Sequence, residues 1–318
     1  MNVTVIGGTG HVGTYLVPRL VELGHTVSCI SRNNRKPYAA HAAWKGVKMV
    51  ALDREAAEAD GSFGSSILAE KPDVVIDMIC FTARSGQILV KALAGQVQQL
   101  LVCGTIWVHG ASVSVPTRET EALNPFGEYG VNKLELTRYL LDESRRTGFP
   151  VSVIHPGHIV GPGWYPINPL GNWNPLVFSR LARGEEIAYP TLGMETVHHV
   201  HADDIAQLFL LAMERWSVAR GEDFNCVSEA AVTLRGFAEV AAGWFGRKAR
   251  LVFRAPDEVW TKGLTEDDVK STWDHMSRSP NSSIQKAKSL LGYAPRYSSL
   301  EAVYESVQWL LSQKMIEV

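Results

Sequence analysis

The stretch that decides the fold lies next to the N-terminus and reads Val3-Thr-Val-Ile-Gly7-Gly8-Thr9-Gly10-His11-Val12-Gly13. It joins a short β-branched run to a Gly-x-Gly-x-x-Gly spacing that starts at Gly8, and a helical pattern follows as far as Leu23. Glycines at this spacing let a chain turn sharply against a pyrophosphate, and the N-terminus of the following helix offers unpaired N–H groups to the anion. The turn therefore predicts a dinucleotide site; the alternative is a glycine-rich turn without a ligand. The residues expected at this site are Gly7, Thr9, Gly10, His11, Val12 and Gly13.

Short β-branched runs alternate with helical patterns through the first half of the chain. This alternation predicts parallel strands joined by right-handed crossovers, with helices on both faces of the sheet. We therefore expect an α/β fold: a Rossmann-type doubly wound parallel sheet with a smaller C-terminal substrate domain. The expected strands span residues 3–6, 26–30, 47–51, 74–79, 99–102 and 151–154, and the helical patterns between them include 12–23, 88–93 and 129–145.

The pattern changes after residue 151, where a loop rich in Gly, Pro, Asn and Trp runs from 157 to 175. We expect residues 1–165 to form the dinucleotide-binding domain, with residues 195–216 returning to it. Residues 166–194 and 217–318 are expected to form the smaller substrate-binding domain.

Composition narrows the function classes. The chain has 318 residues, of which 20% are charged, and its formal net charge of −2 differs from the basic footprint of a dedicated nucleic-acid binder. No apolar run approaches the roughly 18 residues of a membrane span, and no basic segment typical of a signal peptide precedes the first strand. The four cysteines are widely spaced and form no Cys-x-x-Cys pair, which predicts free thiols. We expect a cytoplasmic protein with neither a nucleic-acid nor a membrane partner.

The end of the second expected strand bears on the choice of dinucleotide. A carboxylate here usually accepts hydrogen bonds from the ribose 2′-hydroxyl of NAD, whereas an arginine can hold the 2′-phosphate of NADP. The chain has Ser31-Arg32 at this point, with Arg35 close by, and no acid. This favours NADP, with NAD as the alternative, unless Arg32 is only a solvated loop cation. Asp53, after the third strand, is either an acceptor for the adenine amino group or a loop acid.

A second group of residues predicts acid–base chemistry. Tyr129 and Lys133 are four residues apart in a helical pattern, so their side chains share one face. A lysine close to a tyrosine favours the phenolate and so brings the phenol towards acid–base duty near neutral pH. Thr105 follows the strand at 99–102, at the carboxyl edge where open parallel sheets bind their ligands.

Taken in order, these motifs resemble those of the extended short-chain dehydrogenase/reductases of the NAD-dependent epimerase/dehydratase type. The resemblance covers nearly the whole chain. It rests on the glycine turn, on Thr105, on Tyr129-x-x-x-Lys133, on His155-Pro156-Gly-His-Ile-Val-Gly-Pro162, on Val200-His-Ala-Asp-Asp-Ile-Ala206 and on Lys286-Ala…Leu291-Gly-Tyr-Ala-Pro295.

The resemblance implies hydride transfer between nicotinamide C4 and a carbinol or carbonyl carbon of a small substrate. Tyr129 would be the general acid/base, and Thr105 would hydrogen-bond the same substrate oxygen. Lys133 would hold the nicotinamide ribose, and Pro156 would lie beside the nicotinamide ring. A homodimer is expected on the same analogy.

The chain also departs from the family pattern. The arginine before the proline is replaced by His155, and a sugar-contacting asparagine corresponds to His158. An arginine that contacts a substrate diphosphate corresponds to Val197, and the C-terminal phosphate clamp is absent unless Arg278 substitutes for it. Losing these bidentate donors weakens the case for a nucleotide-diphosphate substrate.

Several residues allow two interpretations. Trp107 and His158 are expected to contact substrate, whereas Asn174, with Trp164 and Trp173 in the same loop, either shapes the pocket or packs the domain seam. The histidines at 198, 199 and 201 could suggest a metal, but the sequence places no fourth ligand, so none is predicted. The favoured function is an oxidoreductase that releases its cofactor. The alternatives are an epimerase or dehydratase that retains it, and a non-catalytic dinucleotide-binding or RNA-associated protein.

Overall fold

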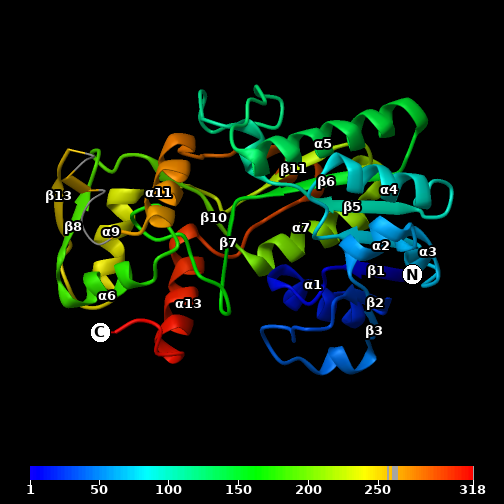
Figure 1. The fold of residues 1–318 in the computed structure, drawn as a ribbon, viewed down its shortest axis with the longest axis horizontal. Coiled ribbons are helices and arrows are strands. Elements are labelled where there is room, and N and C mark those ends of the chain that lie inside the picture. The colour runs from blue at the N-terminus through cyan, green and yellow to red at the C-terminus, as the bar shows by residue number, and fades with distance from the viewer. Residues whose placement is uncertain (256–257, 260–263, 318) are drawn as a thin grey trace.

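A seven-stranded parallel sheet forms the larger part of the computed structural model, which describes residues 1–255, 258–259 and 264–317 (Figure 1). The strand order is β11-β6-β5-β4-β1-β2-β3. The chain adds β2 and β3 on one side of β1 and the later strands on the other side, as in a doubly wound fold. This confirms the predicted fold class. The strands are β1 (Asn2–Ile6), β2 (Thr26–Ser31), β3 (Lys48–Ala51), β4 (Val74–Asp77), β5 (Gln99–Cys103), β6 (Val151–Pro156) and β11 (Asp223–Cys226).

The edge strand β11 corrects one domain boundary. Residues 223–226 were expected in the smaller domain, but they pair in parallel with β6, from Asp223 opposite Val153 to Cys226 opposite Pro156. The segment Asp223-Phe-Asn-Cys226 is short and half polar, so its pattern does not distinguish it from a loop.

Helices cover both faces of the sheet because side chains alternate along each strand. Val74 and Ile76 face the core on one side, whereas Val75 between them faces the core on the other. In Figure 1, α4 and α5 lie above the sheet and α1 and α7 below it. The helices on the first face are α1 (His11–Glu22), α7 (Ala202–Glu214) and α12 (Gln285–Leu291), and those on the second are α2 (Arg54–Asp60), α3 (Phe63–Leu68), α4 (Ala83–Leu93) and α5 (Glu128–Thr147).

A second apolar core holds together the smaller part of the molecule, on the left in Figure 1. Among the described residues, no helix is long and apolar enough to cross a membrane. The elements of this part are α6 (Leu176–Arg183), α9 (Leu234–Gly243), α11 (Glu266–Arg278), α13 (Ser299–Ser312) and the strand pairs β8 (Glu186–Tyr189) with β13 (Arg250–Phe253) and β9 (Thr196–Val197) with β12 (Val232–Thr233). Between the two parts, β7 (His158–Val160) pairs with β10 (His199–His201).

Candidate active site

The glycine turn connects β1 to α1 in a shape that fits a pyrophosphate. Gly7 has φ of +80°, a conformation that favours glycine, and its N–H donates to Ile30 O at 2.8 Å. A Cβ on Gly13 would lie 1.9 Å from Gly8 O, so α1 approaches the turn as closely as its backbone allows. Gly10 is the N-cap of α1 and makes no side-chain capping bond, so the first-turn N–H groups keep their capacity to bind an anion.

Two cavities meet at this turn. The first has a volume of about 320 Å³ and corresponds to the predicted adenosine half, because the ends of β2 and β3 border it. Asp53 also caps α2 by accepting a hydrogen bond from Ala56 N at 3.1 Å. The residues that line this first cavity include the predicted Gly7, Thr9, Gly10, Ser31, Arg32 and Asp53, together with Arg35.

The second cavity, of about 470 Å³, contains the predicted catalytic groups. Arg35 borders both cavities, which places it at the waist between them. The structure thus gathers side chains from the turn, the end of β5, α5 and the end of β6 around one space. The predicted residues that line it are Gly7, Gly10, His11, Val12, Gly13, Thr105, Trp107, Tyr129, Lys133, Pro156 and His158.

Tyr129 and Thr105 lie close together in this cavity. Thr105 is the N-cap of the short helix η2 (Ile106–His109), and its Oγ accepts a hydrogen bond from Trp107 N at 3.3 Å. Although 45% of Tyr129 is exposed, burial on the cavity side raises the pKa of its phenol, and the nearby Thr105 hydroxyl opposes that rise. The phenol and the hydroxyl can therefore contact the same small group.

Lys133 lies one helical turn further along α5 and is 1% exposed. Its Nζ donates to Cys80 O at 2.8 Å and to Cys103 O at 2.6 Å, at the ends of neighbouring strands. These bonds use two of its three N–H donors. Burial lowers the pKa of Lys133, and its Nζ lies 6.0 Å from the centre of the Tyr129 ring.

His155 supports Thr105 from behind, a role that the sequence analysis missed. Its Nδ1 accepts the backbone N–H of Thr105 at 3.0 Å, and its Nε2 lies 3.2 Å from Asp223 Oδ2. Since Nδ1 accepts, the proton of the neutral ring is on Nε2 and is donated to the carboxylate. Lys286 Nζ also contacts Asp223, at 3.3 Å from Oδ1. A guanidinium in place of His155 could not accept the Thr105 N–H, because it has only donors.

Two residues considered at the sequence level have other roles. Asn174 was expected either to shape the pocket or to pack the domain seam; its Nδ2 donates to Asp268 and its Oδ1 accepts from Leu176 N at the start of α6. Arg278, the candidate for a phosphate clamp, is 2% exposed and its guanidinium lies 3.8 Å from the ring centre of Trp107. Its Nη2 donates to Phe126 O, so its charge is directed into the protein.

The histidines that suggested a metal contact protein groups separately. His198 Nε2 lies 3.0 Å from Ser228 O, His199 Nε2 lies 3.1 Å from Ile167 O, and His201 Nε2 lies 3.1 Å from Glu305 Oε2. In the described part of the chain, no group of three or more potential ligands is arranged to hold a metal ion.

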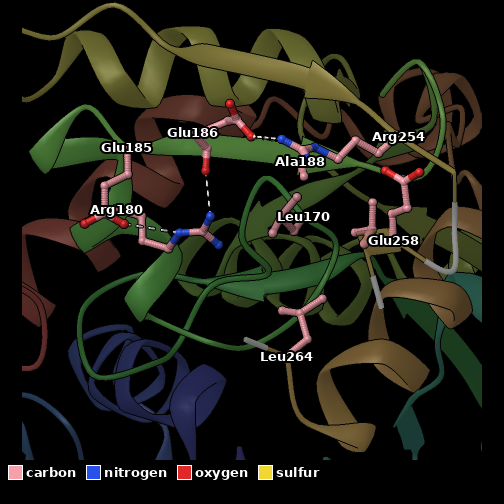
Figure 2. A pocket seen from close by; sticks show the side chains of 9 residues that line it. Leu170, Arg180, Glu185, Glu186, Ala188, Arg254, Glu258 and Leu264 are labelled. Carbon is pink, nitrogen blue, oxygen red and sulfur yellow. Dashed lines mark hydrogen bonds and ion pairs between the residues drawn. The ribbon is translucent and has the colours of Figure 1, made fainter. Parts of the chain in front are cut away.

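A further cavity, of about 420 Å³, lies in the smaller part of the molecule (Figure 2). Its charged side chains largely bind one another: Arg254 pairs with Glu186, and Arg180 lies 3.5 Å from Glu185 and donates to the Glu186 carbonyl. It contains none of the predicted site residues.

Comparison with known proteins shows which family shares this sequence and its site residues. Residues 3–226 match the model of the NAD dependent epimerase/dehydratase family. The chain belongs to this family. The match covers the glycine turn, Thr105, Tyr129 and Lys133, and it ends at the last residue of β11, which confirms the resemblance drawn from the motifs.

Individual relatives carry different names. A "chloroplast stem-loop binding protein of 41 kDa b" from Arabidopsis thaliana is 28% identical over 96% of this chain and 78% of its own length. A "2′-dehydrokanamycin reductase" from Streptomyces kanamyceticus is 34% identical, but over only 42% of this chain and 36% of that protein. A UDP-glucose 4-epimerase structure from Thermotoga maritima superposes with a TM-score of 0.74 at 22% identity, covering 99% of this chain and 100% of that one. That likeness concerns the fold.

Proposed function

We propose that the protein is an NADP-dependent oxidoreductase, which interconverts a hydroxyl and a carbonyl group on a small polar substrate and releases its cofactor after each turnover. The observation that carries this proposal is the convergence of Thr105, Tyr129 and Lys133 on one cavity continuous with the glycine turn. A module that only bound a dinucleotide would have no use for a phenol and a threonine hydroxyl that line the same cavity at that point.

The bound dinucleotide supplies or accepts the hydride. Tyr129 donates its phenolic proton to the substrate oxygen during reduction and removes that proton during oxidation. Thr105 hydrogen-bonds the same oxygen and fixes its position, which lowers the entropic barrier to reaction. Lys133 would hold the cofactor ribose with its third N–H, since its other two donate to Cys80 O and Cys103 O.

The lining of the adenosine cavity supports NADP as the proposed cofactor. Arg32 lines this cavity just after β2, which supports a contact with the 2′-phosphate of NADP, and Arg35 at the waist between the cavities supports a contact with the diphosphate. Gly7 and Gly10 line both cavities at the turn, next to the first-turn N–H groups of α1 that can bind the diphosphate. Asp53 caps α2 with one oxygen and can accept from the adenine amino group with the other.

The test of the proposal is net cofactor consumption. The purified protein is incubated with NADPH and a panel of small carbonyl compounds, and NADPH absorbance is followed together with product formation. The proposal predicts one NADPH oxidised for each alcohol formed. Product formed without net NADPH loss identifies the cofactor-retaining epimerase alternative instead. The homodimer expected from the resemblance stays a prediction.

RNA binding is a second candidate, favoured by the stem-loop binding name of the Arabidopsis relative. The absence of a nucleic-acid partner therefore also stays a prediction. A mobility-shift titration with an RNA stem-loop, with and without NADPH, tests this candidate. A shift that persists in a Tyr129→Phe variant would assign an RNA role independent of the acid/base group.

A further inference from the structure

Two histidines form part of the substrate side of the cavity that holds Tyr129. His158 comes from β7 and His275 from α11, and their ring centres are 4.7 Å apart. They are 7% and 2% exposed, and both border the cavity. The Nε2 atom of each is buried without a hydrogen-bond partner among the described residues. Buried polar atoms are normally satisfied, so this pair points to a ligand that completes it.

The hydrogen bonds on the other side of each ring decide what that ligand must offer. His158 Nδ1 lies 3.3 Å from His198 O, and His275 Nδ1 lies 2.6 Å from Ser271 O. A carbonyl oxygen only accepts, so each Nδ1 carries the ring proton and each Nε2 presents a lone pair. Burial lowers the pKa of His275 to about 4 and holds the pKa of His158 well below its usual range, so both rings are neutral at pH 7.

Aromatic rings form the walls around this pair. Trp107 contacts His275 and Tyr129 edge to face, at 5.3 Å and 5.9 Å between ring centres, and Trp173 contacts His275 in the same way at 6.0 Å. Trp173 continues to the surface, where it borders a shallow cavity with Trp164 and Tyr165. Flat apolar walls of this kind suit a ring-shaped ligand.

The two cations of the cavity are already engaged away from the substrate side. Lys133 and Arg35 are the cations among its described lining residues, and no carboxylate lines it. Lys133 donates twice to backbone carbonyls, and Arg35 lies at the dinucleotide waist. A phosphate or carboxylate on the substrate would face two imidazole lone pairs without a matching donor.

We propose that the substrate of this site is an uncharged ring compound with at least two hydroxyl groups, which donate to Nε2 of His158 and Nε2 of His275. This inference rests on the proposed function and narrows its substrate class. It excludes nucleotide-diphosphate sugars, and it assigns substrate recognition to a residue of α11, far along the chain from the catalytic motifs.

Ligand binding tests the proposal separately from turnover. The full-length protein is titrated with myo-inositol and methyl glucoside, and with inositol 1-phosphate and glucose 6-phosphate as their charged counterparts, while tryptophan fluorescence reports on Trp107 and Trp173. NADPH is titrated in parallel. The uncharged polyols are expected to bind at least about tenfold more tightly than their phosphates, because the phosphates find no donor.

Variants identify the groups responsible. His275→Phe and His158→Phe keep the ring shape but remove the acceptor, and each is expected to weaken polyol binding about tenfold. His275→Gln restores an acceptor oxygen and is expected to recover part of that loss. NADPH affinity is expected to stay unchanged in all three, which also shows that each variant folds.

The outcomes separate this inference from the proposed function. Tighter binding of the phosphates, no polyol binding, or equal polyol binding by wild type and both Phe variants overturns the inference even if NADPH binds. If NADPH does not bind but the polyols respond to the variants as expected, the polyol site stands and the proposed oxidoreductase function fails.

Discussion

The contact between His155 and Thr105 gives a prediction that matched variants can test. The His155 ring is fully buried, with Nδ1 on the Thr105 N–H and Nε2 on Asp223. An asparagine side chain places an amide oxygen close to the position of Nδ1, whereas a glutamine reaches the position of Nε2. His155→Asn therefore keeps the acceptor for Thr105, and His155→Gln keeps only the partner for Asp223.

The magnitude follows from the group left unpaired. A buried N–H without an acceptor costs about 1–3 kcal/mol, and each 1.4 kcal/mol corresponds to about a tenfold change in rate. If the unpaired N–H displaces the Thr105 hydroxyl, the same free energy is added to the reaction barrier. The kcat/KM of His155→Gln then falls by about 5- to 150-fold. His155→Asn keeps most of the wild-type kcat/KM, although it loses the contact with Asp223.

The assay is steady-state NADPH oxidation for both variants, with NADPH affinity measured alongside. His155→Gln is expected to bind NADPH normally, because Thr105 is not part of the glycine turn. Equal kcat/KM for the two variants would refute the reasoning, since it would mean that the Thr105 N–H needs no acceptor. Asp223→Asn serves as a control for the outer contact, and we expect a smaller loss than for His155→Gln.

The remaining predictions concern the cofactor site and stability. Arg32→Ala should weaken NADP binding about tenfold or more while leaving NAD binding nearly unchanged, by titration of both dinucleotides; an equal loss for the two would reject the 2′-phosphate contact. Gly13→Ala should abolish dinucleotide binding and lower the unfolding midpoint, because its Cβ would overlap Gly8 O. Burial lowers the pKa of His199 to about 3 and of His275 to about 4, so both rings stay neutral when folded but take up protons when unfolded below about pH 6.5. The free energy of unfolding should therefore fall as pH decreases from about 6.5 to 4, by ~1.4 kcal/mol per pH unit for each ring. Equal free energies of unfolding at pH 7 and pH 5, measured by urea denaturation, would contradict this.

Local patterns were sufficient for the fold, and they also selected the candidate residues that the structure brings to one cavity. The glycine turn, the alternation of strands and helices, and the Tyr129/Lys133 spacing are each set by residues within a few positions of one another. The place of Thr105 follows from one topological rule, that ligands bind at the carboxyl ends of parallel strands.

Long-range packing accounts for what the sequence did not reveal. His275 reaches the cavity only through the packing of α11, an element of the smaller part of the molecule, and no local pattern links it to His158. His155 was noticed as a departure from the family, but its function depends on Asp223 of the unpredicted edge strand β11. The role of Asn174 stayed open because an asparagine in a loop can hydrogen-bond the start of a helix as well as bind a ligand, and spacing does not distinguish these roles.

The most direct test of the central claim is single-turnover hydride transfer in a Tyr129→Phe variant loaded with NADPH. The variant keeps the ring but lacks the phenolic proton, so NADPH affinity should be unchanged while the transfer rate falls by about 10²- to 10⁴-fold. A transfer rate equal to that of the wild type would show that the substrate oxygen obtains its proton elsewhere, and the account of this cavity as the reaction centre would be wrong.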